Sequence, residues 1–159
     1  MITFALVIAL TIALDLITKA VFTDANMSFI PGFLSIIYVE NRGAAWSFLY
    51  GHVALLATVS IIMVAGLCTW YWWIRRSTIR DGKKLHWTFN IGIALLIGGA
   101  VGNLYDRIFH GHVRDFLSFD FVDFPIFNLA DVFIISGIIG ILLWVLFFDK
   151  RGKEAQNAA

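Results

Sequence analysis

Four long apolar runs limit what this chain can fold into. They cover residues 2–22, 53–74, 85–105 and 129–148. A helix needs about 20 apolar residues to cross roughly 30 Å of hydrocarbon, and each run reaches that length. The runs lack the two-residue alternation of a membrane β-barrel. Because 60% of the residues are hydrophobic and 14% are charged, a water-soluble globule is excluded. We therefore expect an all-α membrane protein, with residues 1–159 forming one domain around a bundle of four transmembrane helices.

Basic residues between the second and third runs, and after the fourth, predict the orientation of the chain. By the positive-inside rule these segments face the cytoplasm, which places both termini inside and loops 23–52 and 106–131 outside. We interpret the basic residues as a topology signal that needs neither a nucleic-acid nor a lipid partner. The first run has no basic start and no small-residue cleavage site, so we interpret it as a retained span. The basic residues concerned are Arg75, Arg76, Arg80, Lys83, Lys84, Lys150, Arg151 and Lys153.

A short segment of the first outer loop has the composition of a β-strand. Residues 33–39 are rich in β-branched and aromatic side chains and follow Pro31-Gly32, a typical turn pair. The sequence therefore predicts a strand pair, and with it a small extracytoplasmic β-sheet on the outer surface of the membrane.

The first run contains two ionisable residues, Asp15 and Lys19. Their spacing of four places them on one helix face, where they can pair with each other. Alternatively, Asp15 points into the bundle and holds a loop or a backbone group. Ionisable groups near hydrocarbon are costly, so either arrangement needs a partner.

Two aspartates near the outer membrane boundary form the strongest catalytic hypothesis. Asp115 lies in an apolar-flanked stretch of the second outer loop, and Asp131 lies at the start of the fourth span. Two neighbouring carboxylates tend to share one proton. One of them can then activate water while the other protonates or hydrogen-bonds a substrate carbonyl. Taken alone, Asp131 could also be a helix-start carboxylate that the macrodipole favours.

Small and polar residues surround these aspartates in the sequence. Gly98 and Gly102 form a G-xxx-G step, which permits close helix contact. Asn103 and Arg107 lie one turn apart on one face. The arginine can grip a carboxylate or a carbonyl with two nitrogens, or it can extend outward to water. Asn41 is a candidate turn residue followed by small residues.

Metal and serine chemistry find little support. The spacing of His110, His112 and Asp115 matches no strong zinc pattern, so we interpret the histidines as loop residues and expect no metal or other cofactor. No G-x-S-x-G motif is present.

Five blocks, in order along nearly the whole chain, resemble the lipoprotein signal peptidase family (signal peptidase II, aspartic peptidase family A8). The blocks are Asp15-x-x-Thr18-Lys19, Asn41-x-Gly43-Ala44-Ala45, Gly98-Gly99-Ala100-x-Gly102-Asn103-x-x-Asp106-Arg107, Val113-x-Asp115-Phe116 and Phe127-Asn128-x-Ala130-Asp131. The resemblance implies an aspartic endopeptidase that removes the signal peptide from bacterial prolipoproteins, just before a cysteine carrying diacylglycerol. It implies the bacterial cell membrane as location, an active site at the extracytoplasmic face, and contact with membrane lipid.

The resemblance also implies roles for individual residues. Asp115 and Asp131 would be the catalytic pair, and globomycin-like peptides would bind between them. The outer strands would cradle the substrate. Trp46 stands where the family usually has phenylalanine. Arg114 replaces a common apolar residue beside Asp115, so the charge and the substrate contacts around that aspartate can differ from those of the family. The residues expected to support the pair or hold substrate are Asp15, Lys19, Asn41, Gly43, Asn103, Arg107, Asn128 and Ala130.

Two other classes of protein remain as alternatives. A small transporter or proton-conducting protein could use Asp15, Asp115 and Asp131 as a relay, but most ionisable groups lie toward one side of the membrane. A structural membrane subunit would explain the spans but not the carboxylate motifs. The self-contained set of motifs favours a monomer.

Overall fold

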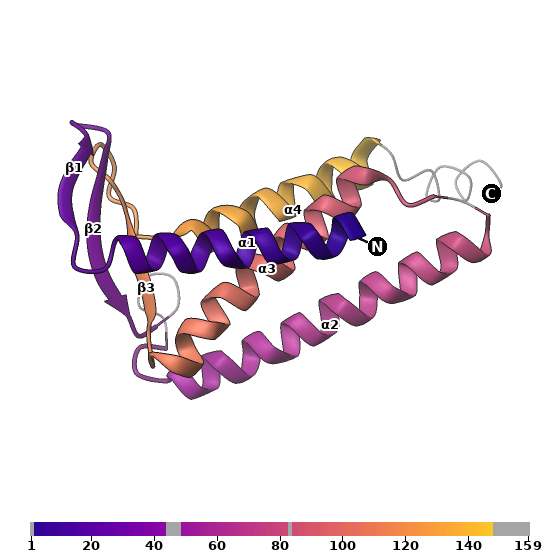
Figure 1. The fold of residues 1–159 in the computed structure, drawn as a ribbon, viewed down its shortest axis with the longest axis horizontal. Coiled ribbons are helices and arrows are strands. Elements are labelled where there is room, and N and C mark those ends of the chain that lie inside the picture. The colour runs from indigo at the N-terminus through magenta and orange to yellow at the C-terminus, as the bar shows by residue number, and fades with distance from the viewer. Residues whose placement is uncertain (1, 44–48, 83, 148–159) are drawn as a thin grey trace.

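The computed structural model describes residues 2–43, 49–82 and 84–147, and contains four long helices with a small sheet across one end of the bundle (Figure 1). All four helices are long and apolar enough to cross a membrane. This confirms the predicted fold class. Three residues of the second block's surroundings, Ala44, Ala45 and Trp46, lie outside the described residues, as does the basic C-terminal segment. The helices are α1 (Ile2–Val21), α2 (Val53–Arg80), α3 (Trp87–Phe109) and α4 (Leu129–Phe147).

Two helices run past the predicted ends of their spans. α2 continues from residue 74 to Arg80, because nothing in this segment interrupts helical hydrogen bonding before Gly82, which has a positive φ of 68°. α3 begins at Trp87 rather than at residue 85, with His86 at its N-cap accepting a hydrogen bond from the backbone N–H of Thr88. α3 ends at Phe109, beyond the predicted residue 105.

α3 is the central helix, and the other three pack against it. Glycines make the closest approaches possible. A Cβ on Gly98 would lie 2.7 Å from the side chain of Thr11 on α1, and a Cβ on Gly99 would lie 2.5 Å from the carbonyl oxygen of Ala130 on α4. The prediction that the G-xxx-G step serves helix packing is therefore confirmed. The apolar core beside these contacts contains Tyr71, Ile74, Phe89, Ile93, Ile97 and Trp144.

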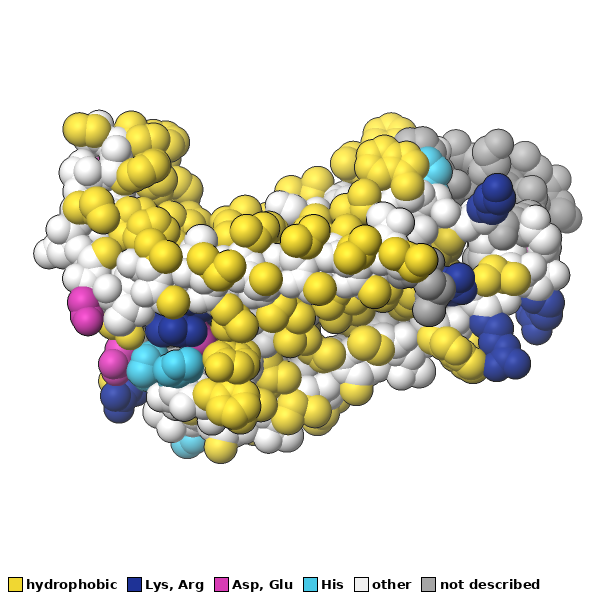
Figure 2. All heavy atoms as spheres, in the orientation of Figure 1, with side chains coloured by type: hydrophobic (Ala, Val, Ile, Leu, Met, Phe, Trp, Pro, Cys, Tyr) yellow, Lys and Arg dark blue, Asp and Glu magenta, His cyan; other side chains and the backbone are white. Residues whose placement is uncertain are grey.

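α1 is polar inside and apolar outside, as expected for a helix surrounded by lipid. Its buried residues are Thr11, Asp15 and Lys19, spaced four apart on one face. Leucines such as Leu10 and Leu14 are exposed instead. Figure 2 shows hydrophobic side chains over the middle of the molecule, with lysines and arginines at both ends, those at the sheet end lying beside histidine and acidic side chains.

The sheet has three antiparallel strands in the order β1 (Asn26–Ile30), β2 (Leu34–Asn41) and β3 (Val113–Phe119). The predicted turn joins β1 to β2: the N–H of Phe33 donates to the carbonyl of Ile30 at 3.0 Å, and Gly32 has a φ of 73°. The predicted strand pair is thus confirmed. The third strand comes from the segment between α3 and α4 and carries Asp115 into the sheet.

Candidate active site

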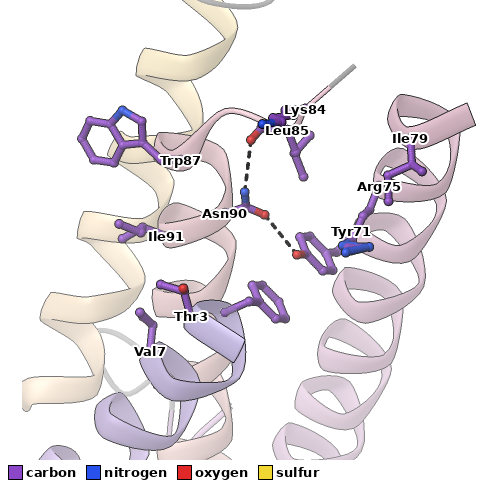
Figure 3. A pocket seen from close by; sticks show the side chains of 11 residues that line it. Thr3, Val7, Tyr71, Arg75, Ile79, Lys84, Leu85, Trp87, Asn90 and Ile91 are labelled. Carbon is purple, nitrogen blue, oxygen red and sulfur yellow. Dashed lines mark hydrogen bonds between the residues drawn. The ribbon is translucent and has the colours of Figure 1, made fainter. Parts of the chain in front are cut away.

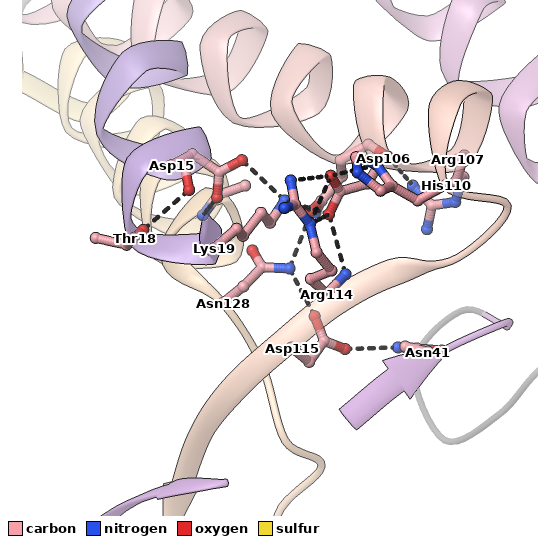
Figure 4. Close-up of polar contacts among 12 residues, drawn as sticks. Asp15, Thr18, Lys19, Asn41, Asp106, Arg107, His110, Arg114, Asp115 and Asn128 are labelled. Atoms are coloured by element: carbon pink, nitrogen blue, oxygen red, sulfur yellow. Dashed lines mark hydrogen bonds and ion pairs between the residues drawn. The ribbon is translucent and has the colours of Figure 1, made fainter. Parts of the chain in front are cut away.

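Asp115 is held between strands at the end of the helix bundle. Its side chain is buried, and its Oδ2 accepts a 2.8 Å hydrogen bond from Nδ2 of Asn41 on β2. The register explains this contact. Val39 pairs with Asp115 and Asn41 pairs with Val113, so Asn41 and Asp115 are diagonal neighbours on one face of the sheet. Figure 4 shows Asp115 between Asn41 and Asn128.

Gly43 orients the amide of Asn41. The backbone N–H of Gly43 donates to Oδ1 of Asn41 at 2.9 Å. Because this oxygen is already occupied, the amide nitrogen faces Asp115. The expectation that Asn41 is a turn residue is correct, and the same turn places its donor at the carboxylate.

Asn128 joins Asp115 to Asp131. An antiparallel bridge between Leu117 and Phe127 lays the segment before α4 along β3. Asn128 then donates through Nδ2 to Oδ1 of Asp115 at 2.6 Å. Its backbone N–H donates to Oδ2 of Asp131 at 3.1 Å, and its Oδ1 accepts the backbone N–H of Asp131 at 3.1 Å. These last two bonds form a reciprocal cap at the start of α4.

Asn103 on α3 completes the connection between the aspartates. Its Nδ2 donates to Oδ1 of Asp131 at 2.8 Å, while its Oδ1 accepts from Nδ2 of Asn128 at 3.0 Å. Asp115 and Asp131, 16 residues apart in the chain, therefore share one amide network. Both line a cavity of about 480 Å³, together with Asn41, Asn103 and Arg107.

Burial changes the acidity of Asp115. Loss of hydration in this site raises the pKa of Asp115 to about 7, and the nearby Asp131 carboxylate acts in the same direction. Hydrogen bonds from Asn41 and Asn128 lower the pKa and partly offset this effect. Near neutral pH, Asp115 can therefore exist in either its protonated or its ionised form.

A buried ion cluster of Asp15, Lys19, Asp106 and Arg114 lies next to the two aspartates and contacts the residues that hold them. Lys19 donates to Oδ2 of Asp15 at 2.8 Å and to Oδ1 of Asn103 at 2.9 Å. The other oxygen of Asp15 accepts the backbone N–H of Ala130 at 2.9 Å. Both sequence interpretations of Asp15 are therefore correct: it pairs with Lys19, and it also holds a backbone group at the start of α4.

Asp106 is a residue of this cluster that the sequence analysis left out of the candidate site. Its carboxylate is fully buried and lies 3.3 Å from Nζ of Lys19. An acidic residue at the end of an otherwise apolar helix was the available signal. Arg114 supplies the remaining contacts, through Nη2 at 2.7 Å, Nε at 3.2 Å and the backbone N–H at 3.0 Å.

The sequence left open how Arg114 affects the charge around Asp115, and the structure places the Arg114 guanidinium on Asp106 instead. Successive side chains of a strand point to opposite faces, so Arg114 points away from the Asp115 side and toward Asp106 (Figure 4). Its charge balances that of Asp106. Lys19 and Arg114 together offset Asp15 and Asp106, so the buried cluster contains two charges of each sign.

Arg107 lines the cavity that contains both aspartates. Its Nη1 donates to the carbonyl of Asn103 at 3.4 Å, and within the described part of the chain no ion pair of Arg107 with a carboxylate is formed. The guanidinium can therefore still bind an acceptor in the cavity.

The two histidines lie beside the ion cluster rather than in the cavity. Nδ1 of His110 lies 3.5 Å from Asp106, and Nδ1 of His112 lies 3.7 Å from Glu40. Among the described residues, no group of three or more histidine, cysteine or acidic side chains could hold a metal ion.

Known proteins resemble this chain over most of its length. The family model described as "Signal peptidase (SPase) II" matches residues 7–148. A lipoprotein signal peptidase of Enterococcus faecalis is 34% identical, with 99% of this chain and 96% of that protein covered. One of Caldicellulosiruptor bescii is 38% identical, with 94% and 93% covered.

A solved structure also matches. It is a bacterial membrane enzyme determined by the in meso method at 2.3 Å resolution, with a TM-score of 0.79 and 31% sequence identity. The match covers 95% of this chain and 91% of that one. Family model, relatives and fold agree with one another, and the chain is a multi-pass membrane protein that belongs to the signal peptidase II family of peptidases.

Proposed function

We propose that this chain removes the signal peptide from diacylglyceryl-modified bacterial prolipoproteins, cutting just before the lipidated cysteine, with Asp115 and Asp131 as its catalytic pair. The observation that carries the proposal is the position of these carboxylates. They come from β3 and α4, line one cavity and are linked through the amide of Asn128. An aspartic peptidase needs no metal, but it needs two carboxyl groups close enough to act on one water molecule and one peptide bond.

The hydrolysis assigns a different task to each aspartate. Ionised Asp131 accepts a proton from a water molecule, and the water oxygen bonds to the scissile carbonyl carbon. Protonated Asp115, whose pKa is raised to about 7, donates its proton to the carbonyl oxygen. The tetrahedral intermediate then collapses. The carbon–nitrogen bond breaks as the leaving nitrogen receives the proton held by Asp131, and one hydroxyl of the intermediate returns its proton to Asp115 as the carbonyl reforms. The products are a carboxylic acid and an amine.

The other polar residues position the substrate and the pair. Arg107 offers its guanidinium to a substrate carbonyl, since among the described residues it forms no ion pair with a carboxylate and it lines the same cavity as both aspartates. Asn41, Asn103 and Asn128 hold the two carboxyl groups in place. Lys19, Gly43 and Ala130 act through their hydrogen bonds to these groups and to Asp15.

The cavity suits a substrate that arrives from the membrane. Its apolar lining includes Phe127 at the end of the segment before α4, and Ile134 and Ile135 on α4. An apolar signal helix and a lipid anchor would enter between these side chains without leaving hydrocarbon. This route explains why a peptidase would be so hydrophobic. A globomycin-like peptide would occupy the same cavity.

The proposed orientation follows from the two ends of the bundle. The site lies at the sheet end, and the arginines of the last turns of α2 lie at the opposite end of the bundle (Figure 1). With the basic end in the cytoplasm, both termini are cytoplasmic and the site faces outward, at the surface of the bacterial cell membrane. We further propose that one copy of the chain suffices, because each residue assigned above comes from the same chain.

The relay alternative is not favoured. Asp15, Asp106 and Asp131 are the acidic residues of the four helices, and all lie at the sheet end of the bundle. α2 contains no acidic residue. A proton path across the membrane would need ionisable groups along its depth.

The test is cleavage by the purified protein of a precursor with a diacylglyceryl cysteine, compared with the same precursor lacking the lipid. We expect cleavage of the lipidated form, unchanged by a chelator and blocked by a globomycin-like peptide. Equal cleavage of both precursors would contradict the substrate assignment. Loss of activity with the chelator would contradict the metal-free mechanism.

A further inference from the structure

A second cavity lies at the end of the bundle opposite the aspartates. It has a volume of about 370 Å³ and is bounded by the first turns of α1, the last turns of α2 and the start of α3 (Figure 3). Val7 and Ile91 line its deeper part, while Arg75 and Lys84 line the part nearest the end of the bundle. The cavity is thus apolar toward the middle of the membrane and basic toward its surface.

The packing of the helices explains why this space exists. α1 and α2 both pack against α3 but make few contacts with each other. Phe4 of α1 stacks on Tyr71 of α2 with ring centroids 4.0 Å apart. The hydroxyl of Tyr71 donates to Oδ1 of Asn90 on α3 at 3.0 Å. These contacts tie the three helices together beside the cavity, so its walls are fixed rather than collapsible.

The two cations of the cavity have no acidic partner among the residues that the structure describes. Within the described part of the chain, neither Arg75 nor Lys84 forms an ion pair, and the lining residues include no carboxylate. By contrast, nearby Arg76, which does not line the cavity, lies over the ring of Trp72 at 4.9 Å. Two cations that line one end of an otherwise largely apolar cavity favour a ligand that is anionic at one end and apolar at the other.

We propose that this cavity binds an anionic phospholipid, with Arg75 and Lys84 on the phosphate and one acyl chain along Val7 and Ile91. An inorganic phosphate would use the cations but leave the apolar lining empty. A zwitterionic lipid would fill the lining but bring its own cation to the basic end. Trp87, exposed at the rim, suits the level of the headgroups. Under this proposal the two basic residues do more than set the topology of the chain.

The test measures lipid retention by native mass spectrometry of the full chain, purified from nanodiscs of equal phosphatidylglycerol and phosphatidylcholine. We expect preferential retention of phosphatidylglycerol. The double variant Arg75→Gln/Lys84→Gln should weaken this retention about 30-fold, because each basic residue near a membrane surface strengthens the binding of an anionic lipid by roughly five- to sixfold. The matched control Arg76→Gln/Arg80→Gln removes the same charge outside the cavity and should retain the lipid.

A second variant separates the cavity from the charges. Ile91→Trp fills the apolar part and leaves both cations in place, so it should also lose phosphatidylglycerol, whereas Ile139→Trp on the exposed face of α4 should not. Cleavage of a lipidated precursor and thermal melting report whether each variant is folded, since none of these residues lies in the catalytic cavity.

Several outcomes would overturn the proposal. Equal loss in both double variants would show that general basicity attracts the lipid. Equal retention of phosphatidylcholine would exclude selection for an anionic headgroup. Displacement of phosphatidylglycerol by millimolar inorganic phosphate would indicate a soluble anion as the ligand.

Discussion

The side-chain amide of Asn128 donates a 2.6 Å hydrogen bond to Asp115, and its backbone donates a 3.1 Å hydrogen bond to Asp131. One residue therefore sets the positions of both carboxyl groups. Catalytic groups lose efficiency quickly when they move from their productive geometry, so the reaction should depend strongly on this amide.

Replacing Asn128 by alanine should lower kcat for a lipidated precursor by about 100-fold, because Asp115 loses its side-chain amide donor and the backbone N–H of Asp131 loses its acceptor. Both carboxyl groups of the proposed catalytic pair remain. The matched control is Asn26→Ala, which removes an exposed asparagine from β1. Steady-state cleavage gives kcat and KM for each variant. If Asn128→Ala kept the parental kcat, the positioning role would be excluded.

The peptidase should lose activity as the pH rises through about 7. The folded pKa of Asp115 is raised to about 7 by burial, so its proton-donating form predominates below this pH and disappears above it. The hydrogen bond from Asn41 lowers the pKa of Asp115. Asn41→Ala removes this bond and should raise that pKa, so the decrease of kcat/KM with rising pH should occur at a higher pH than in the parent. A decrease that stays at the parental pH, or moves to lower pH, would contradict its assignment to Asp115.

Arg114 should stabilise the fold through Asp106. Replacing it by leucine leaves a fully buried carboxylate with Lys19 as its remaining cation, a change that costs roughly 3 kcal/mol of stability. Arg114→Lys keeps the charge but loses the two-nitrogen contact, and should be intermediate. Thermal melting in detergent compares both with Arg76→Leu, an exposed control. A melting temperature of Arg114→Leu equal to that of the control would show that the pair contributes nothing.

Gly102 should be intolerant of any side chain. A Cβ at this position would overlap the carboxylate of Asp15, which holds Lys19 and the backbone N–H of Ala130. We expect Gly102→Ala to lower both the melting temperature and the activity, with a loss of about 1–3 kcal/mol typical of overpacking. Gly66→Ala on α2 meets no atom within 4 Å and serves as the control. Equal stability of the two variants would show that α1 can move away from α3 at no cost.

Much of the fold could be predicted because the membrane imposes simple rules. Apolar runs of nearly 20 residues must become spanning helices, and a Pro-Gly pair before a β-branched segment gave the hairpin of β1 and β2. Strand β3 was harder to recognise, because Arg114 and Asp115 interrupt its apolar pattern. The two side chains point to opposite faces of the strand, and each has a tertiary partner there: Arg114 contacts Asp106, and Asp115 contacts Asn41.

The candidate site was predictable in its residues but not in its connections. The sequence could place Asp15 and Lys19 on one helix face, yet the contact between Asp15 and Ala130 joins positions 115 residues apart. Asp106 was overlooked because its partners, Lys19 and Arg114, come from α1 and β3. Such long-range pairs depend on how the helices pack, which no local pattern contains.

The most direct test of the account is the cleavage rate of a diacylglyceryl-modified precursor by Asp115→Asn and Asp131→Asn, each shown to be folded by its melting temperature. Asparagine keeps the shape of the side chain but can neither take a proton from water nor donate an acidic proton. We expect each variant to lose about 1,000-fold or more in kcat. Cleavage by either variant within about tenfold of the parental rate would contradict a catalytic pair of aspartates, because a tenfold change corresponds to only about 1.4 kcal/mol of activation free energy.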